Sequence, residues 1–396
     1  MPEVPHIIKY MGSKRNILDF VTDSILEFSS PNQRVYDVFG GSAVVAGSLR
    51  NLRPVCCNDI QQYTSVIAKT YLNNYYWSDF KDNIIEEIVF SAQKYFDCFI
   101  KKNPGLEFSY SQAFQLENVI KLEKAQQDLI NREFSGKYHL FTKNYSGTYW
   151  SFEQCLWIDS IMSVAKQAEF KNSFIYDIIL SALMFAMAYT TIGTGHYAQY
   201  RDLTAANLED ILFYRKKSLI NLFTQKFVSL KETYTDNTNS MFEHQTKNLD
   251  YTDLLNGHED NSIVYADPPY QFVHYSRFYH ALETLVRYDY PSVAFKGRYR
   301  TDRHQSPFCI RSEVKGAFTK LFQPVLNKNS TLIISYSDNG MISFADLLSL
   351  GNEMLGRDYR ITDKKLEHTH STMGRQGDKS RIVNEVLIIC QPKSLM

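Results

Sequence analysis

The stretch RVYDVFGGSAVVAGSL, residues 34–49, indicates the fold class. An apolar, strand-like run from Arg34 to Phe39 ends in two glycines, and a helical pattern begins at Ser42. A second strand-like run, Pro54 to Asn58, is followed by another helical pattern. Strands that alternate with helices in this way predict a parallel sheet with helices on its faces.

A different pattern occupies the middle of the chain. Between Asp79 and Leu230 helical segments predominate, whereas strand signals return near Ser262. We therefore expect an α/β domain formed by residues 1–78 and 231–396, interrupted by a mostly helical insertion at residues 79–230. The expected helices are Lys14–Phe28, Phe114–Phe134, Phe152–Ala168, Ser173–Thr191, Leu208–Phe227 and Arg277–Val286, and the later strands are Ser262–Ala266, Thr331–Tyr336 and Ile382–Cys390.

The composition is that of a folded globular chain, since 44% of the 396 residues are hydrophobic and 22% are charged. The longest apolar run, Ile178 to Tyr189, is shorter than a bilayer span and predicts a buried helix. The amino terminus lacks the order of a secretory signal, so we expect a cytoplasmic protein without membrane association. Six cysteines without CxxC spacing predict reduced core residues and no metal site.

The formal net charge is zero, so binding of a nucleic acid would require local segregation of charge. Between Lys296 and Lys320 seven basic residues stand against only two acidic ones. From this strip we predict phosphate contacts by Arg298, Arg300 and Arg303. A solvated loop with ordinary surface charges is the alternative.

The tetrapeptide Asp267-Pro268-Pro269-Tyr270 directly follows a strand-like run. Two prolines remove two backbone donors and hold the chain extended, which leaves carbonyl groups free to point into a cleft. Asp267 and the Pro268 carbonyl can then accept both hydrogens of an exocyclic amine, while the Tyr270 ring stacks on the base. That arrangement requires no metal. A proline turn that begins with an acidic residue is the plainer interpretation.

The glycine pair at residues 40–41 lies at a strand-to-helix turn, where glycine lets the backbone approach a ligand and the helix terminus offers free amides. A tight turn without a ligand gives the same pattern. About twenty residues further on, Asp59 follows the second strand, where α/β nucleoside-binding proteins place an acid that holds ribose hydroxyls. Asp59 is therefore the ribose candidate, and capping of the helix near Gln62 is its alternative role.

Two further segments combine polar and aromatic residues with glycine. The first, KYMGSK at residues 9–14, forms either part of a binding site or a basic turn before a helix. The second, GTGHYAQYR at residues 193–201, is a glycine-flexed loop that can present His196, Gln199 and Arg201 to base edges or to the gap left by a flipped base. A helix C-terminal glycine followed by a surface loop is the alternative.

The order KYMGSK, DVFGGS, long insertion and DPPY strongly resembles the Dam-like class of adenine-N6 DNA methyltransferases over nearly the whole sequence. The resemblance implies a Rossmann-like α/β fold with a mostly parallel, seven-stranded sheet, helices on both faces and ligands at the carboxyl ends of the strands. It also implies S-adenosylmethionine as methyl donor and a flipped-out adenine in double-stranded DNA as target. Four further segments are similar to a branch of these enzymes that is often found beside restriction endonucleases: Asn58-Asp59-Ile60, His274–Thr284, Ser335-Tyr336-Ser337 and Asn384–Leu387. This similarity implies a cognate endonuclease as partner.

The resemblance assigns roles by matching position. The stretch Phe39–Gly41 would lie along the methionine part of the cofactor, Asp59 would hold its ribose, and Asp267–Tyr270 would bind the flipped base. Tyr251, unless it is an ordinary strand aromatic, would border the cofactor adenine, and residues 79–230 would recognise the DNA target. The predicted cofactor-binding residues are Lys9, Tyr10, Gly12, Lys14, Asp37, Phe39, Gly40, Gly41, Ser42, Asp59, Ile60, Asp250, Tyr251 and Asp267, and the predicted DNA-binding residues are His196, Gln199, Arg201, Tyr275, Arg298, Arg300 and Arg303.

Three other functions fit less well. A methyltransferase for cytosine N4 or for RNA is the nearest, but an aspartate at position 267 is, by resemblance, typical of the adenine enzymes. A catalytically silent DNA-binding protein of this fold has no chemical reason to retain Asp267 together with Tyr270. A nicotinamide-dependent dehydrogenase is disfavoured because DVFGGS lacks the GxGxxG spacing that binds a pyrophosphate.

Overall fold

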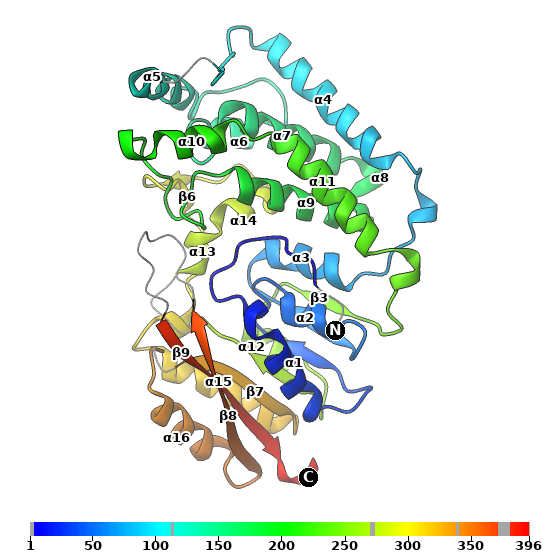
Figure 1. Cartoon of the computed structure of the whole chain (residues 1–396). Helices are drawn as coiled ribbons and strands as arrows, with labels where there is room; N and C mark the ends of the chain where they lie inside the picture. Colours follow the sequence, from blue (N-terminus) through cyan, green and yellow to red (C-terminus); the bar gives the residue numbers. More distant parts are fainter. Residues whose placement is uncertain (1–3, 112–114, 270–273, 338–339, 371–380, 396) are drawn as a thin grey trace.

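The computed structural model describes residues 4–111, 115–269, 274–337, 340–370 and 381–395. Its main element is a seven-stranded sheet in the order β3-β2-β1-β4-β7-β9-β8 (Figure 1). Neighbouring strands from β3 to β7 pair in parallel, and β9 runs antiparallel to both β7 and β8. The expected mostly parallel sheet is therefore confirmed. The strands are β1 (Val35–Asp37), β2 (Val55–Asn58), β3 (Gln245–Lys247), β4 (Ile263–Ala266), β7 (Thr331–Ser337), β8 (Tyr359–His370) and β9 (Arg381–Pro392).

The central strands are buried on both faces, which explains their continuous apolar character. Alternate residues enter two cores. Val35 and Ile263 pack with the first helix group, whereas Tyr36 and Val264 pack with the second. The first group is α1 (Leu18–Glu27), α2 (Val44–Leu49) and α3 (Gln62–Leu72), and the second is α12 (Tyr251–Asn256), α15 (Val314–Asn327) and α16 (Phe344–Leu355). Helices thus cover both faces of the sheet.

The middle of the chain forms a helical layer stacked beyond α3 (Figure 1). It contains α4 (Ile84–Lys102), α5 (Leu116–Gln127), α6 (Leu140–Tyr145), α7 (Phe152–Ala165), α8 (Ala168–Lys171), α9 (Phe174–Thr190), α10 (Leu208–Arg215) and α11 (Leu219–Thr233). The expected buried helix over Ile178–Tyr189 lies within α9, which packs on both α3 and α11. No helix in the described ranges is long and apolar enough to cross a membrane.

Two sequence expectations about helices are wrong. The single helix expected over Leu208–Phe227 is two helices, because the chain turns after Arg215 and the Ser218 hydroxyl caps α11 by accepting from the Asn221 amide at 3.3 Å. The helix expected near Arg277 is divided into α13 (Tyr275–Phe278) and α14 (His280–Arg287). After α14 comes a small antiparallel hairpin, β5 (Val293–Ala294) and β6 (Tyr299–Arg300).

Short 3-10 helices complete the connections: η1 (Lys14–Ile17), η2 (Trp77–Asp79), η3 (Ala205–Asn207), η4 (Asp236–Thr238), η5 (Pro307–Cys309) and η6 (Lys393–Leu395). None of the six cysteines, all of which lie in the described ranges, forms a disulfide, and five of them are buried as expected. Cys98 corrects that expectation, because it lies exposed on the outer side of α4.

Candidate active site

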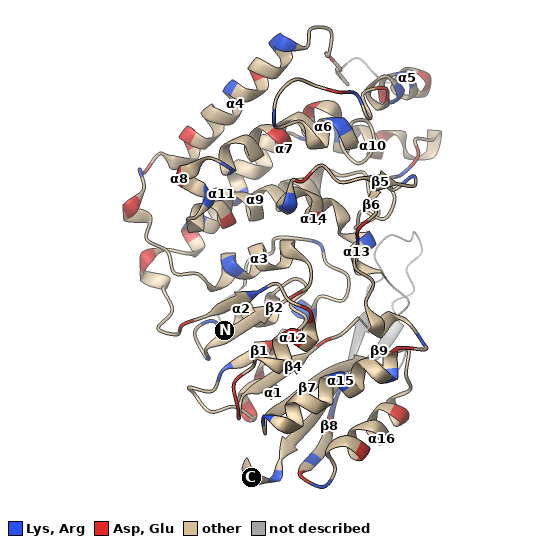
Figure 2. Cartoon of the chain, turned by 180° about the vertical axis from the view of Figure 1, so that it is seen from behind, with Lys and Arg blue, Asp and Glu red and all other residues tan. Residues whose placement is uncertain are grey.

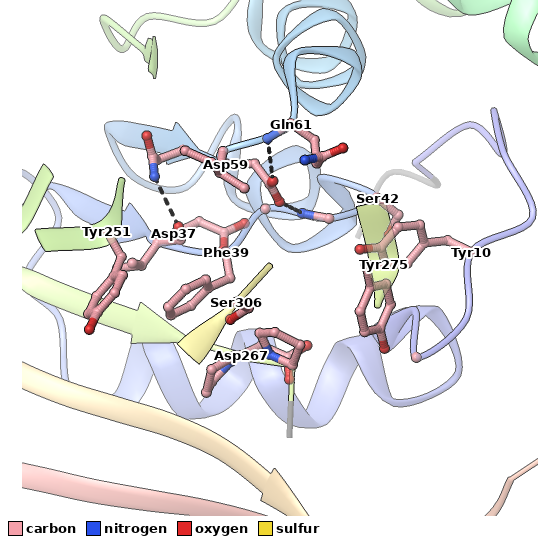
Figure 3. Close-up of a pocket in the computed structure, with 18 of the residues that line it drawn as sticks. Tyr10, Asp37, Phe39, Ser42, Asp59, Gln61, Tyr251, Asp267, Tyr275 and Ser306 are labelled. Carbon is pink, nitrogen blue, oxygen red and sulfur yellow. Dashed lines mark hydrogen bonds between the residues drawn. The ribbon is translucent and has the colours of Figure 1, made fainter. Parts of the chain in front are cut away.

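A cavity of about 1120 Å³, partly open to solvent, lies at the carboxyl ends of β1, β2 and β4 (Figure 3). Open α/β sheets bind their ligands at this edge. The walls come from seven separated segments, around Tyr10, Asp37, Asp59, Asp250, Asp267, His274 and His304.

Asp59 is fixed by the glycine turn beside it. Its Oδ2 accepts from the Gly41 amide at 2.9 Å and its Oδ1 from the Gln61 amide at 2.8 Å (Figure 3). Gly41 has a φ of +53°, and a Cβ atom there would lie 2.9 Å from the Tyr10 ring. Burial raises the pKa of Asp59 to about 6, although the backbone donors oppose the rise. The N-cap of α3 is Gln61, so the capping role predicted for Asp59 is wrong; its carboxylate instead fixes the loop before the helix and the glycine turn beside the cavity.

Asp37, at the end of β1, is a buried acid with an unused acceptor. Its Oδ1 has no hydrogen-bond partner in the described chain, and its Oδ2 faces the Cys57 thiol at 3.9 Å. Burial, reinforced by the charges of Asp267 and Asp59, raises the pKa of Asp37 to about 8. The side chain lines the cavity, so a cationic or hydrogen-donating ligand would meet an acceptor there.

Aromatic rings form the two ends of the cavity (Figure 3). At one end Phe39 packs against Tyr251, with ring centroids 5.7 Å apart, and Tyr251 begins α12 rather than lying on a strand. Asp250 caps that helix by accepting from the Thr252 amide at 2.9 Å. At the other end the Tyr10 ring stacks at 5.6 Å on Tyr275, a residue that the sequence assigned to DNA.

Asp267 lies between these two ends, directly after β4. Its side chain is 19% exposed, and its Oδ1 is 3.0 Å from the Lys14 Nζ. Burial raises the pKa of Asp267 to about 6, Lys14 opposes the rise and Glu385 adds to it. The Cys309 thiol donates to the Pro269 carbonyl at 3.6 Å and holds the proline turn. Tyr270 lies outside the described residues.

Of the two lysines predicted to border the cavity from the amino-terminal segment, one needs correction. Lys9 does not line the cavity, because its Nζ lies 4.5 Å from the centre of the Tyr189 ring on α9. Lys14 does line it, but its ammonium pairs with Asp267 and with Glu385. The other predicted cofactor residues all line the cavity: Tyr10, Gly12, Asp37, Phe39, Gly40, Gly41, Ser42, Asp59, Ile60, Asp250, Tyr251 and Asp267.

Several residues of the site were not predicted. His304, Ser306 and Pro307 belong to the basic strip between Lys296 and Lys320, from which phosphate contacts were predicted, yet they line the cavity. The Ser276 hydroxyl donates to the His304 carbonyl at 2.5 Å and joins this segment to α13. Glu385 was noted only as part of a similar terminal strand. No spacing rule connects it with Lys14, 371 residues away.

The two segments predicted to contact DNA both lie near α13: the hairpin of β5 and β6 is seen close to it (Figure 2), and the Tyr197 amide of the glycine loop donates to the Phe278 carbonyl at 2.7 Å. The Tyr149 hydroxyl contacts both the Tyr197 carbonyl of the glycine loop and the Gly297 carbonyl of the hairpin, the latter at 3.0 Å. His196 stacks on Phe278 with ring centroids 4.2 Å apart, and Gln199 is exposed.

The arginines of these segments differ in availability. Arg201 bonds the Ile192 carbonyl at 3.0 Å and also pairs with Asp210. Arg300 contradicts its prediction, because it is 2% exposed and its guanidinium is held by Asp289 at 2.6 Å and Asp302 at 2.9 Å. Arg298 and Arg303 remain partly exposed, so they stay the arginine candidates of the basic strip.

The cavity suits S-adenosylmethionine on structural grounds. Four aspartates line it, and one of them has an unpartnered buried oxygen, which favours a ligand that carries positive charge. The aromatic pair at Phe39 and Tyr251 offers a face to a purine ring. Among the described residues, no group of three or more His, Cys, Asp or Glu side chains is arranged to hold a metal ion.

A seven-stranded sheet with one antiparallel strand, helices on both faces and an acidic cavity at the strand ends define the α/β class of S-adenosylmethionine-dependent methyltransferases. Within that class the chain belongs to the D12 class N6 adenine-specific DNA methyltransferase family, which matches residues 10–338.

Curated relatives agree with this assignment. Modification methylase LlaI of Lactococcus lactis subsp. lactis is 24% identical over 87% of this chain and 48% of its own length. Type II methyltransferase M.FokI of Planomicrobium okeanokoites is 24% identical over 89% of this chain and 48% of its own length. Type II methyltransferase M.NlaIII of Neisseria lactamica is 22% identical over 85% of each chain. The chain thus spans about half the length of the first two relatives.

Proposed function

We propose that this chain transfers a methyl group from S-adenosylmethionine to N6 of an adenine flipped out of double-stranded DNA. The observation that carries the proposal is Asp267: a carboxylate at the end of β4, open to a cavity of the donor-binding kind and held by a buried ammonium. Family membership supports both the donor and the target base.

The chemistry requires help for a weak nucleophile. The lone pair of the adenine amine is delocalised into the ring, and acceptance of its two hydrogens by Asp267 and by the Pro268 carbonyl favours a pyramidal nitrogen that can attack. S-adenosylmethionine supplies an electrophilic methyl group, and its sulfur takes the electron pair of the broken C–S bond. As the N–C bond forms, the nitrogen becomes positive, Asp267 stabilises that charge and then accepts the released proton.

Residues of the cavity are proposed to divide between donor and base. Gly40 and Gly41, which line the cavity, would lie along the methionine part, and Asp59 is positioned to accept from the ribose hydroxyls. Phe39 and Tyr251 would enclose the donor's adenine, since their rings form one wall of the cavity. The proline turn after Asp267, with Tyr270, would receive the flipped base.

The DNA surface is proposed to combine the glycine loop at 193–201 with the hairpin after α14, since contacts through Tyr149 join the two. Exposed Gln199 and the partly exposed Arg298 and Arg303 can meet bases and phosphates. Phe295, at the hairpin turn, is 75% exposed, an aromatic group suited to stacking on an unpaired base. The helical layer at residues 79–230 would carry target recognition.

A biological role in restriction-modification is proposed from the three relatives described above, each of which carries the name modification methylase or type II methyltransferase. In that role the enzyme would act in the cytoplasm, where it would protect DNA from a cognate endonuclease. Methylation of cytosine N4 or of RNA is the second candidate, and the aspartate at position 267 together with the family assignment argues against it.

The test is transfer of labelled methyl from S-adenosylmethionine to duplex DNA and, separately, to RNA, followed by digestion and identification of the labelled nucleoside. We expect N6-methyladenine in DNA, within one short sequence context. Label on cytosine N4 or on RNA would contradict the proposed target, and absence of label with intact donor binding would contradict the proposed activity.

A further inference from the structure

Glu385 lies beneath Asp267, on β9, and contacts it through Lys14. The Lys14 Nζ is 2.7 Å from the Glu385 Oε1 and 3.0 Å from the Asp267 Oδ1. The Ser335 hydroxyl, on the adjacent β7, donates to the same Glu385 oxygen at 2.5 Å. Lys14 is 6% exposed and Glu385 2%. The catalytic carboxylate is therefore the outermost group of a buried cluster drawn from four separate elements.

The cluster contains one more carboxylate than the stability of the fold requires. One ammonium between two carboxylates leaves a net charge of −1, and a buried uncompensated charge is costly. A single carboxylate would neutralise Lys14. The second one makes the cluster able to take up one proton and become neutral, and the open side of that cluster is Asp267, which lines the cavity.

We propose that Glu385, acting through Lys14, is a positioning residue for the methyl transfer: it fixes the Asp267 carboxylate and gives the cluster the charge needed to accept the amine proton. The inference rests on the proposed function. As the N–C bond forms at N6, one N–H bond breaks, its electron pair stays on nitrogen, and the proton passes to an Asp267 oxygen. The net charge of the cluster then changes from −1 to zero.

Lys14 and Glu385 shift the pKa of Asp267 in opposite directions. The ammonium of Lys14 lowers the pKa of Asp267 and the carboxylate of Glu385 raises it. Within the described ranges, the charge of Asp267 also acts on Asp37, from the end of β1, and on Tyr265, within β4. Removal of Glu385 therefore makes Asp267 a weaker base, and removal of Lys14 makes its ionised form harder to maintain.

The experiment measures the rate of single-turnover methyl transfer as a function of pH for Glu385→Gln and Lys14→Met. DNA and donor are kept at saturating concentrations, so that titration of Asp59 at the donor end of the cavity does not alter the measured rate. In Glu385→Gln we expect the rate to fall about 10- to 100-fold, which is a smaller loss than removal of a general base causes. We also expect the acid limb of the pH profile, where the rate falls as Asp267 becomes protonated, to move down by about 1 pH unit. In Lys14→Met we expect the acid limb to move up by about 1 pH unit.

Two matched variants separate this role from a purely structural one. Glu123→Gln disrupts another buried ion pair, with Arg215 at 2.7 Å in the helical layer, and should lower the thermal midpoint without moving the acid limb. Glu385→Asp retains the charge and should return the acid limb to its wild-type position.

The proposal is overturned if Glu385→Gln keeps the wild-type acid limb, or if the Gln and Met variants both move it in the same direction. It is equally overturned if Glu385→Asp fails to restore the limb, a comparison that holds even where the Gln variant is unstable. Because wild-type transfer is measured in the same series, failure of the inference is distinct from failure of the proposed function.

Discussion

Binding of S-adenosylmethionine is predicted to release protons from the cavity. The sulfonium and ammonium groups of S-adenosylmethionine are cationic, and three of the aspartates that line the site hold protons at unusually high pH, because burial raises the pKa of Asp37 to about 8 and those of Asp59 and Asp267 to about 6. A positive charge nearby stabilises the ionised carboxylates and lowers these pKa values, so bound protons leave.

The magnitude follows from the three pKa values. At pH 6.5 Asp37 carries nearly one proton, and Asp59 and Asp267 carry about a quarter each, so full ionisation on binding releases about 1 to 1.5 protons. The ligand's own amine is already protonated at that pH and does not alter the count. At pH 9 the three aspartates contribute only about 0.1 proton, because they are then largely ionised before binding.

Titration calorimetry in buffers of different ionisation enthalpy gives the number directly, as the slope of observed enthalpy against buffer enthalpy. In Asp37→Asn the slope at pH 6.5 should fall to about half a proton, because only Asp59 and Asp267 remain to titrate. A wild-type slope of zero would refute the ionisation scheme. An unchanged slope in Asp37→Asn would refute the assignment to Asp37.

Two comparisons test other parts of the structure. Gly41→Ala should lower the free energy of unfolding by about 1–3 kcal/mol and weaken donor binding, since Gly41 has a φ of +53° and the new Cβ would lie 2.9 Å from Tyr10. Gly316→Ala is the control: its Cβ meets open space in α15, so the change should be neutral or stabilising by up to about 1 kcal/mol. Arg300→Ala should lower the thermal midpoint by the loss of about 1–2 kcal/mol, because it removes the buried guanidinium that holds Asp289 and Asp302 and leaves both aspartates to the more exposed Arg287. Arg303→Ala should leave the midpoint unchanged and make DNA binding less salt-sensitive by about one unit of slope. A salt slope altered only by Arg300→Ala would reverse the last two assignments.

The sheet and most of the cavity could be predicted from the sequence because their signals are local. DVFGGS, Asp59 and DPPY each follow a short buried strand, and parallel strands bring their carboxyl ends to one edge. The short edge strand β3 carried too weak a pattern to be expected from the residues themselves. β8 likewise shows mixed polar and charged residues rather than an apolar run.

What the sequence did not reveal depends on contacts between distant segments. Arg300 and Arg303 stand in the same basic strip, so the sequence does not distinguish them. The fold shows that two aspartates enclose Arg300. Lys14 was predicted beside the cofactor, but its partner Glu385 comes from the last strand, and pairing across the whole chain leaves no local pattern. Lys9 faces Tyr189 on α9, a contact between distant segments that likewise leaves no local pattern in the sequence.

The most direct test of the central claim is methyl transfer by Asp267→Ala and Asp267→Asn, compared with wild type at equal occupancy of donor and DNA. The account predicts that both variants bind donor and DNA within a few-fold of wild type and that formation of N6-methyladenine falls at least about 10²- to 10³-fold. Transfer at a near wild-type rate in either variant would contradict the assignment of Asp267 as the catalytic residue.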